Sequence, residues 1–200
     1  DYIRLIKVLQ GAAMLSLVLN VVALWKQEPR NPERTRHDRA RPAFTSAWRD
    51  FLDEGRNRRL LVALAMGTMG FAMQDVLLEP YGAQILGLSV ASTTQLTALF
   101  AVGMLMAFAW ASRSLARGRD PIRIAGTGGV LGVFAFATVI FSAPLESSAL
   151  FRFGTVGIGL GHGLFAVGTL TYAMLLGTEG MAGLAIGAWG AVQTAATGVA

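Results

Sequence analysis

The stretch FGTVGIGLGHGLFAVGTLTYAMLLGT, residues 153–178, runs for 26 residues without a charged side chain. A helix needs about 20 mostly apolar residues to cross a hydrocarbon core of about 30 Å. Two further charge-free runs separate Glu79 from Arg113 and Arg123 from Glu146. None of these runs shows the polar–apolar alternation of membrane β-barrel strands. The sequence therefore predicts an all-α fold, a polytopic membrane helix bundle.

The composition supports the same fold class. Hydrophobic residues make up 54% of the chain and charged residues only 14%, where soluble domains carry about 25% charged residues. The chain has no cysteine, so neither a disulfide framework nor a thiolate metal site can form. The chain begins on Asp1 and ends inside an apolar run, and we therefore expect a segment of a longer protein. We predict six transmembrane helices, near residues 8–25, 60–78, 90–112, 124–143, 153–176 and 180–200, and we expect the last of them to be cut short.

Basic residues predict the orientation of these helices. Ten Lys and Arg residues lie between positions 26 and 59, four lie between 113 and 123, and none lies between 79 and 89. Because short cytoplasmic loops of membrane proteins are enriched in Lys and Arg, the loops 26–59 and 113–123 are predicted to be cytoplasmic. The net charge of +5 is thus explained by topology, and nucleic acid is not a predicted partner.

The long basic loop has two halves of different character. QEPRNPERTRHDRARP, residues 27–42, is typical of a solvated linker. In the second half Phe44, Trp48, Phe51 and Leu52 recur at helical spacing, with charged residues on the opposite side. This pattern predicts an amphipathic helix, which either lies on the cytoplasmic membrane face or packs on the mouths of the spanning helices.

Glycines in the opening stretch predict close helix packing. Gly157 with Gly161 and Gly159 with Gly163 form two offset small-xxx-small pairs, which allow another helix to approach closely. The same glycines match no dinucleotide-binding fingerprint, and they follow no strand. Phosphate-loop, HExxH, GxSxG and zinc-site signatures are also missing from the sequence, so an enzyme is not predicted.

His162 lies in the middle of this glycine-rich helix. It follows Arg152 by ten residues, which places it about 15 Å deep, near the membrane midplane. An imidazole at that depth needs a partner. Three interpretations remain open: a neutral histidine hydrogen-bonded to a neighbouring helix, an axial ligand for the metal at the centre of a pigment, or a proton relay.

A second polar feature interrupts the apolar segment GFAMQDVLLEPYGAQILGL, residues 70–88. Counted from Arg59, Asp75 lies about 24 Å across the membrane and Glu79 about 30 Å across. A charge at a helix centre costs about 2.5–3.5 kcal/mol on insertion scales, and less near the boundary. We therefore expect Asp75, next to Gln74, to need a partner or a cavity, whereas Glu79 lies at the interface.

Pro80 follows directly, and proline removes a helical hydrogen bond. We expect the helix to end or kink at Pro80, with Tyr81 and Gly82 forming the turn. The alternative interpretation of the whole segment is an ordinary polar helix end.

Two stretches resemble a known family. QDVLLEPYGAQILGLS, residues 74–89, and GLGHGLFAVGTLTYAMLL, residues 159–176, are similar to the PucC/LhaA-type light-harvesting assembly proteins, the bacteriochlorophyll delivery branch of the major facilitator superfamily. The resemblance extends through essentially the whole chain. It implies a photosynthetic bacterial inner membrane, bacteriochlorophyll as a transiently bound cofactor, and light-harvesting antenna polypeptides as partners, with the reaction centre as a further candidate.

The resemblance also implies a domain organisation. Residues 1–25 would be the last helix of an N-terminal half, residues 26–59 the cytoplasmic connection, and residues 60–200 a truncated C-terminal half, so that the chain carries helices six to eleven of twelve. The superfamily's loop signature is incomplete, because SRSLARGRDP has Leu115 where an Asp is expected. In that fold helices seven and ten line the central cavity. The resemblance therefore gives the candidate pigment-binding or cavity-lining residues as Gln74, Asp75, Glu79, Tyr81 and His162.

Three functions follow from these observations. The first is a non-enzymatic assembly factor that binds or delivers bacteriochlorophyll to antenna polypeptides. The second is a proton-coupled transporter of a small molecule, with Asp75 as the titrating carboxylate. The third is a scaffold whose lipid-facing helices hold antenna subunits, which is compatible with the first.

Overall fold

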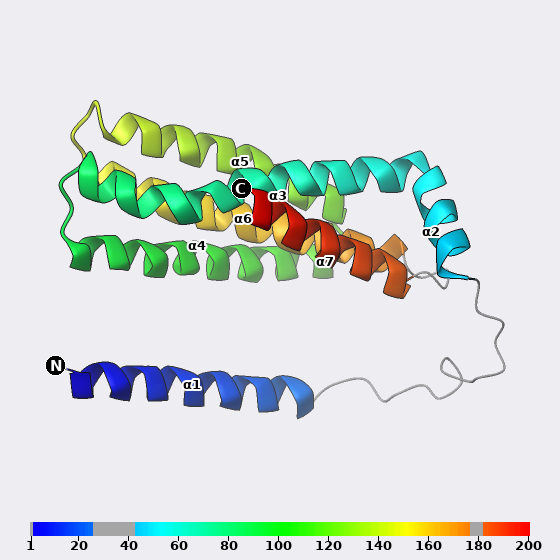
Figure 1. Ribbon diagram of the computed structural model, residues 1–200, viewed down its shortest axis with the longest axis horizontal. Coiled ribbons are helices and arrows are strands. Elements are labelled where there is room, and N and C mark those ends of the chain that lie inside the picture. The colour runs from blue at the N-terminus through cyan, green and yellow to red at the C-terminus, as the bar shows by residue number, and fades with distance from the viewer. Residues whose placement is uncertain (1, 26–42, 177–181) are drawn as a thin grey trace. The chain divides into compact units, whose positions relative to one another are not determined.

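A computed structural model describes residues 2–25, 43–176 and 182–200 of the chain (Figure 1). These residues form seven helices and no strand. The first helix, α1, belongs to one compact unit, residues 1–42, and the other six belong to a second unit, residues 43–200. The helices are α1 (Tyr2–Trp25), α2 (Phe44–Asp53), α3 (Gly55–Gln84), α4 (Val90–Ala116), α5 (Pro121–Ser142), α6 (Ser148–Leu176) and α7 (Ala182–Val199).

Five of these helices, α1, α3, α4, α5 and α6, are long and apolar enough to cross a membrane. They coincide with five of the predicted spans, which confirms a polytopic helical membrane protein. The sixth predicted span forms α7, but α7 does not belong to the five. Its Gly and Thr residues, together with Gln193, lower its hydropathy. The predicted linker, residues 27–42, lies outside the described residues.

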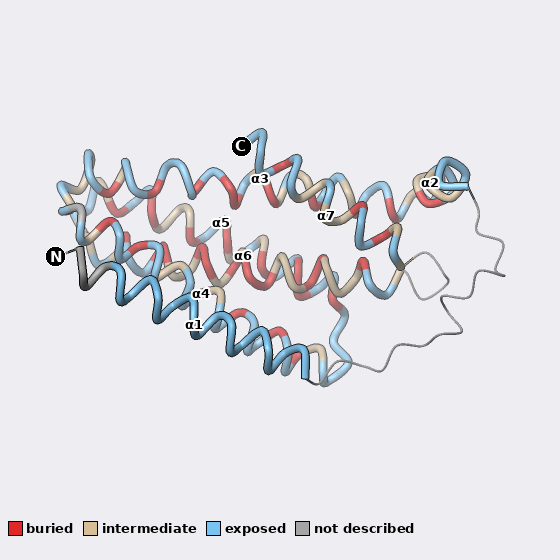
Figure 2. Tube along the Cα trace, turned by 60° about the horizontal axis from the view of Figure 1, so that its bottom comes forward, coloured by how far each residue is buried: buried red, intermediate tan, exposed pale blue. Residues whose placement is uncertain are grey.

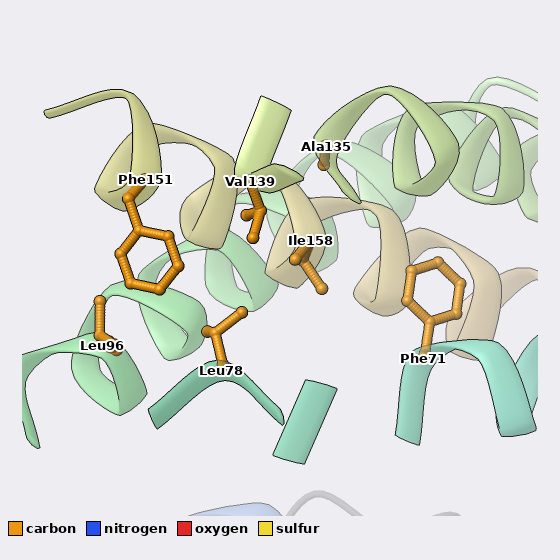
Figure 3. Close-up of a cluster of buried hydrophobic side chains, with 7 residues drawn as sticks. All are labelled: Phe71, Leu78, Leu96, Ala135, Val139, Phe151 and Ile158. Atoms are coloured by element: carbon orange, nitrogen blue, oxygen red, sulfur yellow. The ribbon is translucent and has the colours of Figure 1, made fainter. Parts of the chain in front are cut away.

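α6 is the central helix of the second unit, and Figure 2 shows buried residues along most of its length. Its most extensive packing is against α5, followed by α4. A cluster of apolar side chains joins α6 to its neighbours (Figure 3). The buried members of this cluster are Phe71 and Leu78 of α3, Leu96 of α4, Ala135 and Val139 of α5, and Phe151 and Ile158 of α6.

The C-terminal end of α3 corrects one expectation. The helix does not end at Pro80 but continues to Gln84, so that Tyr81 and Gly82 are helical. The chain turns at Gly87, whose φ of +62° lies in the left-handed region that glycine adopts readily. Proline is tolerated inside membrane helices when neighbouring packing compensates for the lost hydrogen bond. Here Tyr81 and Leu88 pack against the buried apolar cluster and hold the last turn of α3 in place.

The amphipathic segment forms α2, as its spacing predicts. Its inner side is buried: Phe51 is only 2% exposed and packs with Ala185 and Ala188 of α7. Phe44, at the start of the helix, is 70% exposed and stacks on Trp48. α2 therefore packs on the ends of neighbouring helices and also presents an aromatic side chain outward, so both predicted placements are compatible with it.

Candidate functional site on α3 and α6

The polar residues of α3 line a small cavity. Gln74 is 6% exposed, and its amide Nε2 donates a hydrogen bond to Oδ1 of the neighbouring Asp75. Together with Glu79 they face Thr97 and Phe100 of α4 across a cavity of about 60 Å³. We expected Asp75 to need a partner or a cavity, and the structure gives it both: the Gln74 amide as a hydrogen-bond partner and this cavity.

Tyr81 lies apart from that cavity. Its hydroxyl donates a hydrogen bond to the carbonyl oxygen of Ile140, at 3.3 Å, and its ring stacks on Phe151 with a centroid separation of 5.8 Å. Tyr81 therefore ties the end of α3 to α5 and α6. The structure does not bring it together with the acidic residues that precede it.

His162 is held between aromatic rings. Its imidazole stacks on Phe71 with centroids 5.1 Å apart and planes 16° apart, and it contacts Phe100 at 5.7 Å. Its Nδ1 atom is buried and has no hydrogen-bond partner among the described residues. Phe100 also lines the small cavity, so this ring lies between the imidazole and the space that the polar residues of α3 line.

An unpaired, buried imidazole nitrogen has the chemistry of a metal ligand, but His162 does not line the small cavity of about 60 Å³. Phe71 and Phe100 flank the imidazole. The residues around His162 therefore do not fit a tetrapyrrole in this conformation, and its role as an axial ligand stays an untested prediction.

A larger groove lies between α3 and α5, and sequence reasoning missed it. Its volume is about 420 Å³ and its lining is almost entirely apolar. The rim residues Met66 and Val133 are each 70% exposed. The lining residues are Met66, Gly67, Gly70, Phe71, Met73, Leu77, Gly129, Gly132, Val133, Phe136 and Phe165.

Aromatic rings and glycines shape this groove. A Cβ added to Gly132 would lie 2.6 Å from the ring of Phe71, and one added to Gly67 would overlap the ring of Phe165. Phe71 lies 5.8 Å from Phe165 and 6.2 Å from Phe136 between ring centroids. By contrast, nothing lies within 4 Å of a Cβ added to Gly70 or Gly129. In the sequence, the only hint of this groove is a pair of glycines three residues apart on each helix, Gly67 with Gly70 on α3 and Gly129 with Gly132 on α5.

The four candidate packing glycines of α6 face two different helices. Cβ atoms added to Gly157 or Gly161 would meet α5, the latter 2.8 Å from the carbonyl oxygen of Gly128. Those added to Gly159 or Gly163 would meet α4, at Phe100 and Ala107 respectively. These glycines therefore allow α6 to approach both neighbours at backbone distance, and they line no cavity described above.

Five helices of membrane-spanning length and a groove that opens on their apolar surface define a polytopic α-helical membrane protein with a candidate site for an apolar ligand. The family model described as PUCC protein matches residues 1–200. The chain belongs to this family.

The relatives agree with this assignment. The chain is 51% identical over 198 residues, 98% of its length, to Protein PucC of Rhodovulum sulfidophilum. It is 47% identical over its full length to an uncharacterized protein in the puhA-bchM intergenic region of Rhodobacter capsulatus, and 45% identical over 98% of its length to Protein PucC of Cereibacter sphaeroides. The matches cover 44%, 42% and 43% of these relatives, so the chain spans less than half their length. No solved structure matches the chain.

Proposed function

We propose that this protein takes part in the assembly of photosynthetic light-harvesting complexes, and that it binds bacteriochlorophyll transiently for delivery to antenna polypeptides in the photosynthetic membrane. Membership of the PucC family supports the first part. The apolar groove between α3 and α5 is the observation that carries the second part.

The groove suits part of a pigment molecule in three respects. Its volume of about 420 Å³ lies within the range of small-molecule sites. The rings of Phe71, Phe136 and Phe165 offer stacking surfaces for a conjugated macrocycle. Its exposed apolar rim at Met66 and Val133 lets a hydrophobic molecule enter from the bilayer while its remainder extends into lipid.

The direct test is to purify the full-length protein from pigment-producing cells and record its absorption spectrum. We expect bound chlorin, and we expect a deletion strain to assemble less antenna complex. Protein purified from cells that make no bacteriochlorophyll provides the baseline spectrum. A purified protein without chlorin, together with normal antenna assembly in the deletion strain, would contradict the proposal.

A second candidate function, proton-coupled transport of a small molecule, rests on the cavity that Gln74, Asp75 and Glu79 line. Vesicles containing the full-length protein separate it from the first. Transport predicts a flux driven by a pH gradient that Asp75→Asn abolishes, whereas pigment delivery predicts no such flux.

A scaffold role is compatible with pigment delivery, because the outer surfaces of the spanning helices carry many exposed apolar side chains that could hold antenna subunits. Crosslinking in cells that assemble antenna should then recover antenna polypeptides next to this protein. Recovery of none would remove the scaffold role.

A further inference from the structure

A polar cleft separates the end of α4 from the beginning of α5. Its volume is about 450 Å³, and it is lined by Trp110, Gly118, Arg119, Asp120, Arg123, Ile124 and Thr127. Trp110 lies six residues before the end of α4 and Thr127 six residues after the start of α5. At 1.5 Å per residue, the cleft extends about 9 Å along both helices from the turn that connects them.

Two arginines provide the charge of this cleft. The guanidinium of Arg119 lies 6.0 Å from the ring centroid of Trp110, and Arg123 is exposed in the first turn of α5. Within the described ranges neither arginine forms an ion pair with a carboxylate. Their positive charge is therefore available to an external anion.

The acidic residue of the cleft already has a structural task. Oδ1 of Asp120 accepts a hydrogen bond from the backbone N–H of Ile122 at 2.9 Å, which caps α5. Gly118, with φ of +75°, reverses the chain between the two helices. The turn thus fixes the backbone positions of the two arginines. With two arginines and one aspartate, the cleft keeps a net positive charge.

We propose that this cleft binds the phosphate of an anionic membrane phospholipid. Guanidinium groups bind phosphate oxygens through paired hydrogen bonds. Basic pockets at the ends of membrane helices are suited to lipid headgroups. The apolar lining residues are Trp110 and Ile124, and Trp110 lies six residues inside α4, so the cleft combines charged groups at the helix ends with apolar surface for the start of an acyl chain.

The choice of a lipid over a soluble phosphate rests on position. Both α4 and α5 are long and apolar enough to span the membrane, so their ends lie where lipid headgroups are concentrated. Tryptophan and arginine are also the residues that membrane proteins place at this level. The lipid and the pigment would use different surfaces, because the cleft shares no lining residue with the groove between α3 and α5.

Native mass spectrometry of the full-length protein tests this proposal. The protein in neutral detergent is titrated with phosphatidylglycerol, and separately with phosphatidylcholine of the same chain length. Arg119→Gln/Arg123→Gln is the test variant. Arg58→Gln/Arg152→Gln is the matched control, because it removes two exposed positive charges outside the cleft. A third titration adds inorganic phosphate to the phosphatidylglycerol complex.

We expect the unmodified protein to retain phosphatidylglycerol in preference to phosphatidylcholine. Since each Lys or Arg near an anionic surface contributes about 1 kcal/mol, the test variant should bind phosphatidylglycerol about 30-fold more weakly, and the control should bind it as the unmodified protein does. Equal weakening in both variants, equal retention of the two lipids, or displacement by millimolar inorganic phosphate would each overturn the proposal.

Discussion

The two sides of the second unit differ in how closely their helices approach. On one side, α6 meets α4 and α5 at glycines, and an added Cβ at Gly159 or Gly161 would collide with backbone atoms. On the other side, α3 packs much less extensively against α4 and α6. The small polar cavity and the apolar groove both lie along α3. The comparison indicates that α6 forms a closely packed support with α4 and α5, whereas the spaces in which a ligand can bind lie along α3.

The largest expected effect comes from breaking the close side. In Gly159→Ala the new methyl group would overlap the carbonyl oxygen of Phe100, so that α4 and α6 would have to separate. Overpacking of this kind costs about 1–3 kcal/mol, and a backbone obstacle favours the upper end of that range. Thermal unfolding of the purified protein and its abundance in the membrane would measure the loss.

The matched control is Gly126→Ala in α5, where an added Cβ has no neighbour within 4 Å. This substitution should leave stability unchanged or raise it by up to about 1 kcal/mol, as expected for Gly→Ala inside a helix. If the two variants behave alike, the close approach of α4 and α6 at Gly159 does not contribute to stability.

The second prediction concerns the polar residues of α3. Asp75→Ala removes the acceptor for the buried Gln74 amide, at a cost of about 1–3 kcal/mol. Asp75→Asn keeps a side-chain oxygen that can accept the same hydrogen bond, and should cost less than about 1 kcal/mol. We expect Asp75→Asn to preserve protein abundance but to lower antenna assembly, measured by the absorption of isolated membranes. Parallel losses of abundance and assembly would assign Asp75 a purely structural role.

A smaller effect is expected at the hydrogen bond between α7 and α6. Nε1 of Trp189 donates a hydrogen bond to Oγ1 of Thr169 in α6 at 3.1 Å. Trp189→Phe keeps an aromatic ring but removes the donor, so it should lower the unfolding free energy by about 1 kcal/mol. Chemical denaturation of the purified protein would detect this change, and Thr169→Val combined with Trp189→Phe should add little to it. A fully additive double variant would show that the two side chains are not coupled.

The smallest effect on pigment retention is expected at His162. Its ring is stacked on Phe71, and His162 is not among the residues that line the apolar groove. His162→Phe preserves an aromatic ring at this position and should retain bacteriochlorophyll within about twofold of the unmodified protein, because the groove rather than the imidazole carries the proposed binding. A loss of most of the pigment would instead show that Phe71 moves aside and that the imidazole contacts the pigment.

Much of this fold could be predicted from the sequence, because each membrane span requires about 20 consecutive apolar residues, which can be recognised without knowing the tertiary structure. Charge-free runs such as residues 153–178 fix the positions of helices directly. Local propensity predicted that the helix ends or kinks at Pro80, with Tyr81 and Gly82 in the turn. The position of the turn was wrong, because α3 continues to Gln84 and the contacts of Tyr81 and Leu88 with the apolar cluster are tertiary.

The candidate site was less accessible to sequence reasoning. Gln74, Asp75 and His162 stand out in the sequence as polar residues in apolar helices. Phe100 of α4 contacts His162 and also lines the cavity of Gln74 and Asp75, and this arrangement depends on how α3, α4 and α6 pack. The groove, however, depends on the ring of Phe165 resting on Gly67, two residues far apart in the sequence. No periodicity indicates which ring lies over which glycine, so the groove could be found only in three dimensions.

The most direct test of the central claim is to fill the groove and measure the pigment. Gly70→Leu/Gly129→Leu adds two side chains at positions that are free of neighbours and that line the groove, and Gly126→Leu adds one in α5 outside it. The full-length variants are purified from pigment-producing cells, and chlorin absorption is measured per protein. The account predicts that the groove-filling variant loses most of its bacteriochlorophyll while Gly126→Leu retains it. Equal pigment in all three proteins, at equal stability, would contradict the account.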